Sequence, residues 1–124
     1  MIAADTSSLV AFFAGGAGPD IDQIRQALGS GTLRISPVVF TELLSDPRTG
    51  TQLENVIAEW RRLEITDGYW LRAARARAKL LALKLSSKLP DTLIAQSSID
   101  YDVPLIARDD GFRHFAKHCG LRLA

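Results

Sequence analysis

The segment IAADTSSL (residues 2–9) decides the fold that this sequence predicts. Its first three residues form a short apolar run, which is typical of a buried strand, and the run ends at Asp5. Three hydroxyl residues follow, and because Ser and Thr are favoured at helix starts we expect a helix from Thr6 onward. A buried strand that leads directly into a helix is the repeating unit of an α/β fold.

The same alternation continues along the chain. Short apolar or alternating segments predict further strands at residues 33–36, 63–65, 103–107 and 121–123, and amphipathic segments between them predict helices. The longest helix is expected over residues 69–88, with an inward face of Leu71, Ala74, Ala78, Leu81 and Leu85. The pattern predicts one domain over residues 1–124, a three-layer α/β/α fold with a mostly parallel central sheet of four to five strands.

Net charge, cysteine content and hydropathy limit the partners and the compartment that we expect for this protein. The net charge is +1, so any nucleic-acid contact has to come from a local patch. The single cysteine, Cys119, excludes an intrachain disulfide and fits a reducing compartment. No apolar run is long enough to cross a membrane and the N-terminal residues do not resemble a signal peptide, so we expect a cytoplasmic protein without a membrane partner.

Four acidic residues occupy positions where sites form in such folds. Asp5 and Asp109 follow expected strands, and Glu42 and Asp91 lie early in expected helices. Sites of open α/β sheets form beyond the carboxyl ends of the strands, so these side chains can meet there. Carboxylates at close range repel one another unless a cation lies between them. Their oxygens suit Mg²⁺ or Mn²⁺, which can activate water and orient a phosphodiester.

Each acid also has an ordinary structural explanation. Asp5 and Asp91 can cap helices, Glu42 can be a solvated helix residue, and Asp109 can belong to a turn. The metal-binding interpretation therefore depends on the order and placement of all four acids together.

The segments around the acids are IAADTSSL (residues 2–9), SPVVFTELL (36–44), DTLIA (91–95) and LIARDDGF (105–112). In order and spacing they resemble the four motifs of the PIN-domain family, and within it the VapC-type toxin ribonucleases of type II toxin–antitoxin systems. The resemblance covers nearly the whole chain.

This resemblance implies a metal-dependent endoribonuclease that cleaves single-stranded or loop RNA. Asp5, Glu42, Asp91 and Asp109 would be the catalytic residues and the ligands of Mg²⁺ (or Mn²⁺), and Thr6 would assist through its hydroxyl. It also implies a cognate antitoxin protein whose tail fills the active-site groove, and a homodimer. The alternative is a catalytically weak or inactive PIN-like module that binds RNA or a protein partner.

Two positions of the fourth motif depart from the family pattern. The family usually has Thr or Ser where this chain has Ala107, and Asp or His where it has Gly111. Asp110 therefore stays open as an alternative fourth acid. We assign the role to Asp109 because it directly ends the expected strand.

Basic residues of the long helix are the candidate RNA contacts. Arg72, Arg75 and Lys79 share one face at helical spacing and can bind RNA phosphates, or they can form an ordinary solvated surface.

Other phosphate chemistries on similar sheets lack their motifs here. A phosphatase with an aspartate nucleophile needs a second Asp two residues after Asp5, where this chain has Ser7. The glycine-rich segment at residues 15–18 follows a helix instead of joining a strand to a helix, so it is no phosphate-binding loop.

Overall fold

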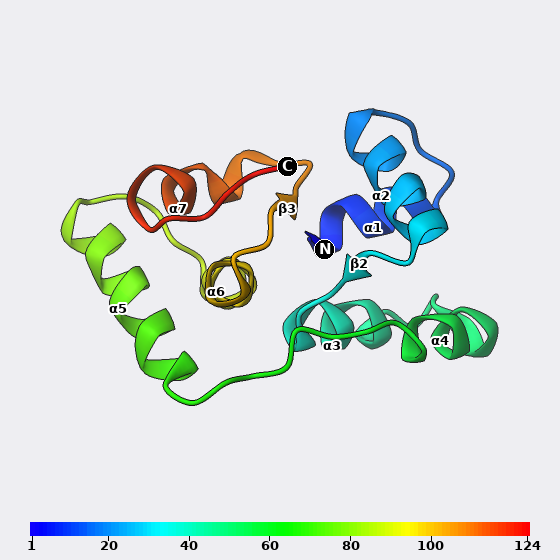
Figure 1. The fold of residues 1–124 in the computed structure, drawn as a ribbon, viewed down its shortest axis with the longest axis horizontal. Coiled ribbons are helices and arrows are strands. Elements are labelled where there is room, and N and C mark those ends of the chain that lie inside the picture. Colours follow the sequence, from blue (N-terminus) through cyan, green and yellow to red (C-terminus); the bar gives the residue numbers. More distant parts are fainter.

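Strand β1 (Ile2–Ala4) is the centre of a three-stranded parallel sheet in the computed structural model, which describes residues 1–124 (Figure 1). Strand β2 (Leu33–Arg34) pairs with one edge of β1 and strand β3 (Leu105–Ile106) with the other. Since the three strands are parallel, their carboxyl ends meet at one edge of the sheet. Asp5 lies at that edge, and its backbone N–H donates to the carbonyl oxygen of Ile106 at 2.9 Å.

The expectation of four to five strands is wrong. Two of the expected strands are present only as single parallel bridges, between Ile35 and Arg62 and between Leu105 and Leu123. Each segment makes two backbone hydrogen bonds to the sheet edge. At the first bridge Ile35 N donates to Arg61 O at 3.2 Å and Leu63 N donates to Ile35 O at 2.9 Å. After Leu63 the chain leaves the edge toward α5 (Tyr69–Ala82), so no ladder extends from the first bridge (Figure 1).

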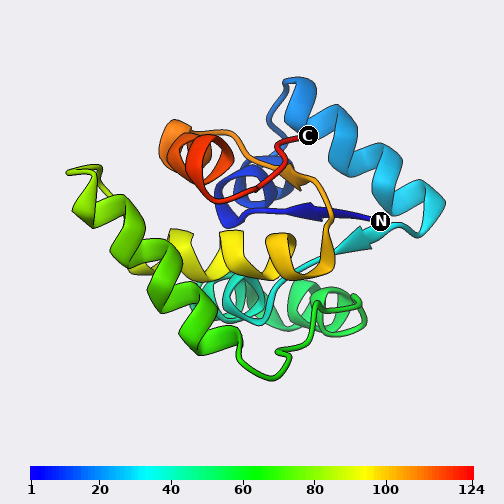
Figure 2. The same ribbon diagram turned by 60° about the vertical axis from the view of Figure 1, so that its left-hand side comes forward.

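Helices cover both faces of the sheet, as the sequence predicts. In Figure 2, α3 and α6 lie below β1 and α2 and α7 lie above it. The helices are α1 (Thr6–Phe13), α2 (Pro19–Ser30), α3 (Pro37–Ser45), α4 (Gly50–Ala58), α5 (Tyr69–Ala82), α6 (Leu89–Tyr101) and α7 (Arg113–His118), with a 3₁₀ turn, η1 (Asp110–Phe112), before α7.

Side-chain caps begin the helices that leave the carboxyl edge of the sheet. The Asp5 carboxylate accepts from Ser8 N at 3.2 Å and caps α1. The Ser36 hydroxyl accepts from Val39 N at 3.1 Å and caps α3, whose first residue is Pro37. Capping of this kind satisfies N–H groups that have no partner in the first helical turn. These caps determine where α1 and α3 start, and so where Thr6 and Glu42 lie.

A single apolar core joins the sheet to the helices. Its largest fully buried members include Leu9 of α1, Ile24 of α2, Val39 of α3, Leu105 of β3 and Phe115 of α7. Burying such side chains contributes roughly 1.5–3 kcal/mol each. The core therefore fixes the strands and the helices relative to one another at the carboxyl edge of the sheet.

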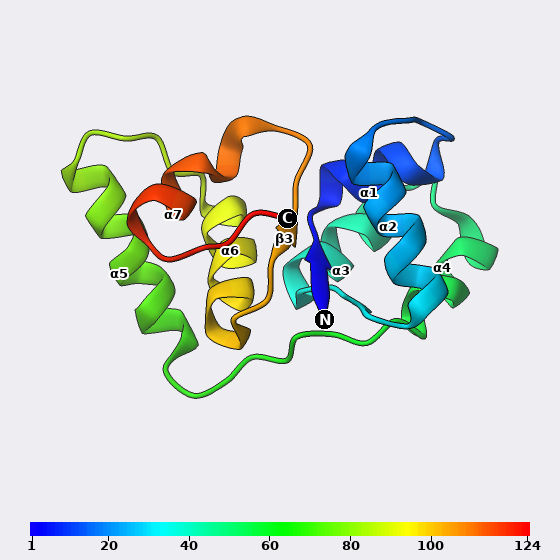
Figure 3. The same cartoon turned by 45° about the horizontal axis from the view of Figure 1, so that its top comes forward.

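Helix α5 differs from the expectation in length and in its buried face. It ends at Ala82, where Lys84 adopts a positive φ of 61° and Leu85 N donates to Leu80 O. Its buried residues are Tyr69, Ala73 and Leu80, whereas Leu71 and Leu81 of the expected inward face are about half exposed. Figures 1 and 3 show the reason: α5 is an outer helix that packs on α6 and α7 and does not reach the sheet.

No helix of this chain has both the length and the apolar character that a membrane crossing requires.

Candidate active site

The four predicted acids line one cavity at the carboxyl edge of the sheet. Asp5 comes from the end of β1, Glu42 from α3, Asp91 from the first turn of α6 and Asp109 from the segment after β3. The cavity has a volume of about 240 Å³, and its other lining residues are Thr6, Ser7, Ile94 and Phe112. The fold thus brings together carboxylates that are up to 104 positions apart in the chain.

Asp5 is the most deeply buried of the four acids, with 2% of its surface exposed. Burial raises the pKa of its carboxyl from 3.8 to about 6, and repulsion from Asp109 adds to this effect. Hydrogen bonds from the Ser7 hydroxyl, at 2.9 and 3.1 Å to the two carboxylate oxygens, and from Ser8 N act in the opposite direction. Asp5 is thus a helix cap and a cavity-lining carboxylate at once.

Thr6 connects the first and second motifs. Its hydroxyl donates to Glu42 Oε1 at 2.6 Å. A short hydrogen bond to a carboxylate is stronger than one between neutral groups, so Thr6 restricts the orientation of the Glu42 side chain. An auxiliary role for the Thr6 hydroxyl stays a prediction.

Asp91 and Asp109 lie on either side of Gly111. A Cβ atom added to Gly111 would be 2.7 Å from Asp91 Oδ2 and 3.0 Å from Asp109 Oδ1. The backbone N–H of Gly111 donates to Asp109 Oδ1 at 2.9 Å. Burial and the charges of Asp109 and Glu42 raise the pKa of Asp91, and Lys88 partly offsets them. A glycine at position 111 therefore lets the two carboxylates approach the same backbone.

The donor set of the cavity fits a hard divalent cation. Four carboxylates and two hydroxyls line it, and no Lys, Arg or His is among the lining residues. Burial is the main cause of the raised pKa values of Asp5 and Asp91, and repulsion from Asp109 contributes to both. No three of these side chains are close enough to form a ready-made ligand set.

Asp109 lines the cavity, whereas Asp110 does not. The Asp110 side chain is 92% exposed and lies 4.0 Å from Arg113. Contrary to expectation, Asp109 does not directly end a strand: β3 ends at Ile106, three residues earlier. The carboxylate of Asp109 caps η1 instead, so the turn explanation and the position in the cavity are both correct descriptions of this residue.

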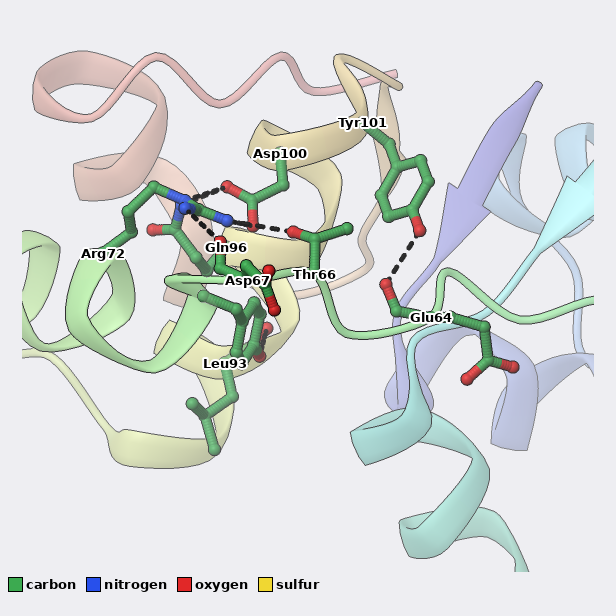
Figure 4. A network of polar contacts seen from close by, with 9 residues as sticks. Glu64, Thr66, Asp67, Arg72, Leu93, Gln96, Asp100 and Tyr101 are labelled. Atoms are coloured by element: carbon green, nitrogen blue, oxygen red, sulfur yellow. Dashed lines mark hydrogen bonds and ion pairs between the residues drawn. The ribbon is translucent and has the colours of Figure 1, made fainter.

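The basic face of α5 is only partly free. Arg72 binds the Asp100 carboxylate through two hydrogen bonds, at 2.9 and 2.7 Å, and also contacts Asp67 O and Thr66 (Figure 4). Lys79 Nζ donates to His118 O at 2.6 Å. The Arg75 side chain is exposed and makes no hydrogen bond or ion pair with another residue of the chain. Contact of these residues with RNA stays a prediction, and Arg75 is the most available of the three.

Sequence reasoning missed three residues that shape the cavity. Ser7 holds both oxygens of Asp5, Gly111 contacts two carboxylates, and Arg108 anchors the segment before Asp109. The signal for Gly111 was present in the sequence as a departure from the fourth motif. Ser7 and Arg108 had no such signal, because their partners are defined only by the folded chain.

Comparison with known proteins agrees with this geometry. A sequence model of the PIN domain matches residues 2–118, so the chain belongs to the PIN domain family. The recognition made from the four motifs is thereby confirmed. A search of curated protein sequences finds no match.

Solved structures with the same fold come from toxin–antitoxin complexes. A chain of VapBC-5 from Mycobacterium tuberculosis superimposes with a TM-score of 0.69 at 17% identity, over 98% of this chain and 95% of that one. A chain of VapBC2 from Rickettsia felis, bound to a DNA fragment from its promoter, gives 0.68 at 17% identity, over 100% and 98%. A toxin–antitoxin complex from Klebsiella pneumoniae gives 0.67 at 21% identity, over 98% and 95%. At these identities the likeness establishes the fold.

Proposed function

We propose that this protein is a metal-dependent endoribonuclease that hydrolyses RNA phosphodiester bonds, and that it acts as the toxin of a toxin–antitoxin pair. The observation that carries the proposal is the cavity in which Asp5, Glu42, Asp91 and Asp109 meet without any basic residue among the lining side chains. PIN domains are generally nucleases, and membership in that family supports hydrolysis as the reaction class.

In this proposal Asp5, Asp91, Asp109 and Glu42 hold Mg²⁺ (or Mn²⁺). Such an ion supplies a nucleophilic water at neutral pH and stabilises charge on the phosphate and the leaving oxygen. Ser7 keeps the Asp5 carboxylate in one orientation through its two hydrogen bonds, and Thr6 does the same for Glu42. These hydroxyls hold the carboxylates in place before RNA binds, which lowers the reorganisation needed for reaction.

Two apolar hollows beside the acids are candidate binding sites for protein partners. One lies between α1, α3 and α4, has a volume of about 320 Å³ and includes Phe13 and Leu53; the other, of about 360 Å³, includes Trp70 and Leu89. Both share Glu42 with the acid cavity. We propose a cognate antitoxin, in keeping with the toxin–antitoxin complexes that share this fold, and a homodimer formed through one of the two hollows. Light scattering of the purified chain measures the homodimer directly.

The test of the proposed function is cleavage of a labelled single-stranded RNA pool by the purified chain. We expect cleavage with Mn²⁺ and none with EDTA. The Asp91→Ala variant should be inactive with Mn²⁺, because it lacks one of the four carboxylates. Equal cleavage by the variant would assign the activity to a contaminant. If the unchanged chain binds RNA and does not cut it, the non-catalytic module is the correct alternative.

A further inference from the structure

The segment before Asp109 is not held by backbone hydrogen bonds. Strand β3 makes its last ladder contact at Ile106, whose carbonyl oxygen accepts from Asp5 N. No residue from 107 to 109 takes part in a backbone–backbone hydrogen bond. Between the buried Ile106 and Phe112, which anchor its two ends, this segment is restrained by side-chain contacts.

Arg108 makes those contacts. Its Nε donates to Asp20 Oδ2 at 2.8 Å and its Nη2 donates to Asp20 Oδ1 at 3.1 Å, while Nη2 also donates to Ala17 O at 2.8 Å. The pair joins residues 88 positions apart. A forked guanidinium–carboxylate pair restricts both distance and orientation, which a single point contact does not do. Arg108 thereby attaches the segment after β3 to the first turn of α2.

The surroundings of this pair favour its formation. The Asp20 side chain is only 11% exposed, and Arg108 lowers the pKa of the Asp20 carboxyl through their hydrogen bonds. The preceding loop leaves room for it: Gly18 has a φ of 141°, and a Cβ atom there would be 2.8 Å from Asp20 Oδ1 and 3.3 Å from Arg108 Nη2. The loop between α1 and α2 is thus shaped around the ion pair.

We propose that Arg108 is a positioning residue for the metal site, because its contacts with Asp20 and Ala17 hold the adjacent Asp109 carboxylate beside Asp91 and Asp5. This inference rests on the proposed function. Arg108 is absent from the cavity lining, so it acts through Asp109. Support of this indirect kind typically changes metal affinity by about 10–100-fold when it is removed.

The chain contains a matched control for this role. Arg72 and Asp100 form the same forked pair, with an additional bond to a backbone carbonyl, and their exposed fractions of 42% and 8% are close to the 40% and 11% of Arg108 and Asp20 (Figure 4). Asp100 lies nine residues after Asp91, at the other end of α6 and roughly 13 Å along the helix axis. Loss of either pair should destabilise the fold similarly, but only one pair supports the acid cavity.

The experiment compares Arg108→Gln and Arg72→Gln by calorimetric titration with MnCl₂. We expect Arg108→Gln to raise the Kd for Mn²⁺ by about tenfold and Arg72→Gln to leave it unchanged, although both lower the unfolding free energy. Arg108→Lys keeps the charge without the fork and should have an intermediate Kd; it carries the comparison if circular dichroism shows that Arg108→Gln does not fold. Without metal, the ¹⁵N–¹H signal of Gly111, which donates to Asp109, should move in the Arg108 variants only.

An equal Kd for the unchanged chain and both Arg108 variants would overturn this inference while leaving the metal site intact. Equal weakening by Arg108→Gln and Arg72→Gln would also overturn it, because general destabilisation would then explain the effect. If the unchanged chain binds no Mn²⁺, the proposed metal site itself fails, and this inference fails with it. The result for the unchanged chain therefore separates the two failures.

Discussion

Replacing Asp5 with Asn should make the metal-free protein more stable at neutral pH while abolishing its metal binding and cleavage. Asn has nearly the same shape and can still accept hydrogen bonds from Ser7 and Ser8. At neutral pH the native carboxylate is charged despite its burial, and raising its pKa from 3.8 to about 6 corresponds to a loss of about 3 kcal/mol of folding free energy. Because this shift already includes the Ser7 and Ser8 hydrogen bonds that favour the charged form, we expect the variant to gain about 3 kcal/mol at neutral pH.

The pH dependence provides the control for this prediction. The unfolded chain loses the Asp5 proton near pH 3.8 and the folded chain keeps it until about pH 6, so the destabilisation is absent below the lower value, grows between the two and is complete above the upper one. Urea unfolding in EDTA, followed by tryptophan fluorescence, should show the gain of Asp5→Asn at about pH 7.5 and almost none below pH 3.8.

Metal addition should reverse the order of stability. An ion that binds only the folded state stabilises it, so Mn²⁺ should raise the unfolding free energy of the unchanged chain and not that of Asp5→Asn. A variant that is no more stable than the unchanged chain at neutral pH in EDTA would refute the reasoning, and so would a gain of equal size at both pH values.

Three further predictions concern the same cavity. Gly111→Ala should weaken Mn²⁺ binding in calorimetry because its Cβ would displace the nearby carboxylates, whereas Gly29→Ala, with open space around its Cβ, should leave binding unchanged and stabilise α2 by about 0.5–1 kcal/mol. Asp109→Asn should abolish RNA cleavage and Asp110→Asn should retain it, since only the former lines the cavity; the opposite outcome would reassign the fourth acid. Thr6→Val should reduce the cleavage rate by about tenfold with little change in unfolding free energy, because it removes a positioning hydrogen bond near the surface; an unaltered rate would exclude this role.

Local sequence signals predicted the parts of the site that depend on neighbouring residues. Asp5 caps α1, as expected from the preference of Asp for helix starts, whereas Ser36, the last residue of an expected strand, caps α3. The strand that precedes Asp5 was readable from three apolar residues. Because β1 ends and α1 begins where the sequence indicates, the position of Asp5 between them could be predicted from the sequence, and Glu42 lies in a helix as expected.

Signals in the sequence failed where the outcome depends on what an element packs against. The leucines of α5 follow a helical period, yet Leu71 and Leu81 are half exposed because α5 packs mainly on α6 and α7. The segments around Arg62 and Leu123 have strand-like composition, yet each makes a single bridge. Strand length depends on a partner that runs alongside, and composition does not specify that partner.

The sequence by itself determined the α/β class, the membership in the PIN domain family and the four acids that meet in the cavity, because each depends on short motifs and their order along the chain. Only the tertiary structure decided that the sheet has three strands, that Asp109 and not Asp110 lines the cavity, and that Arg108 holds its segment through Asp20. The physical reason is distance along the chain. Contacts between residues 88 positions apart depend on how the core orients whole elements, and local preferences carry no information about that orientation.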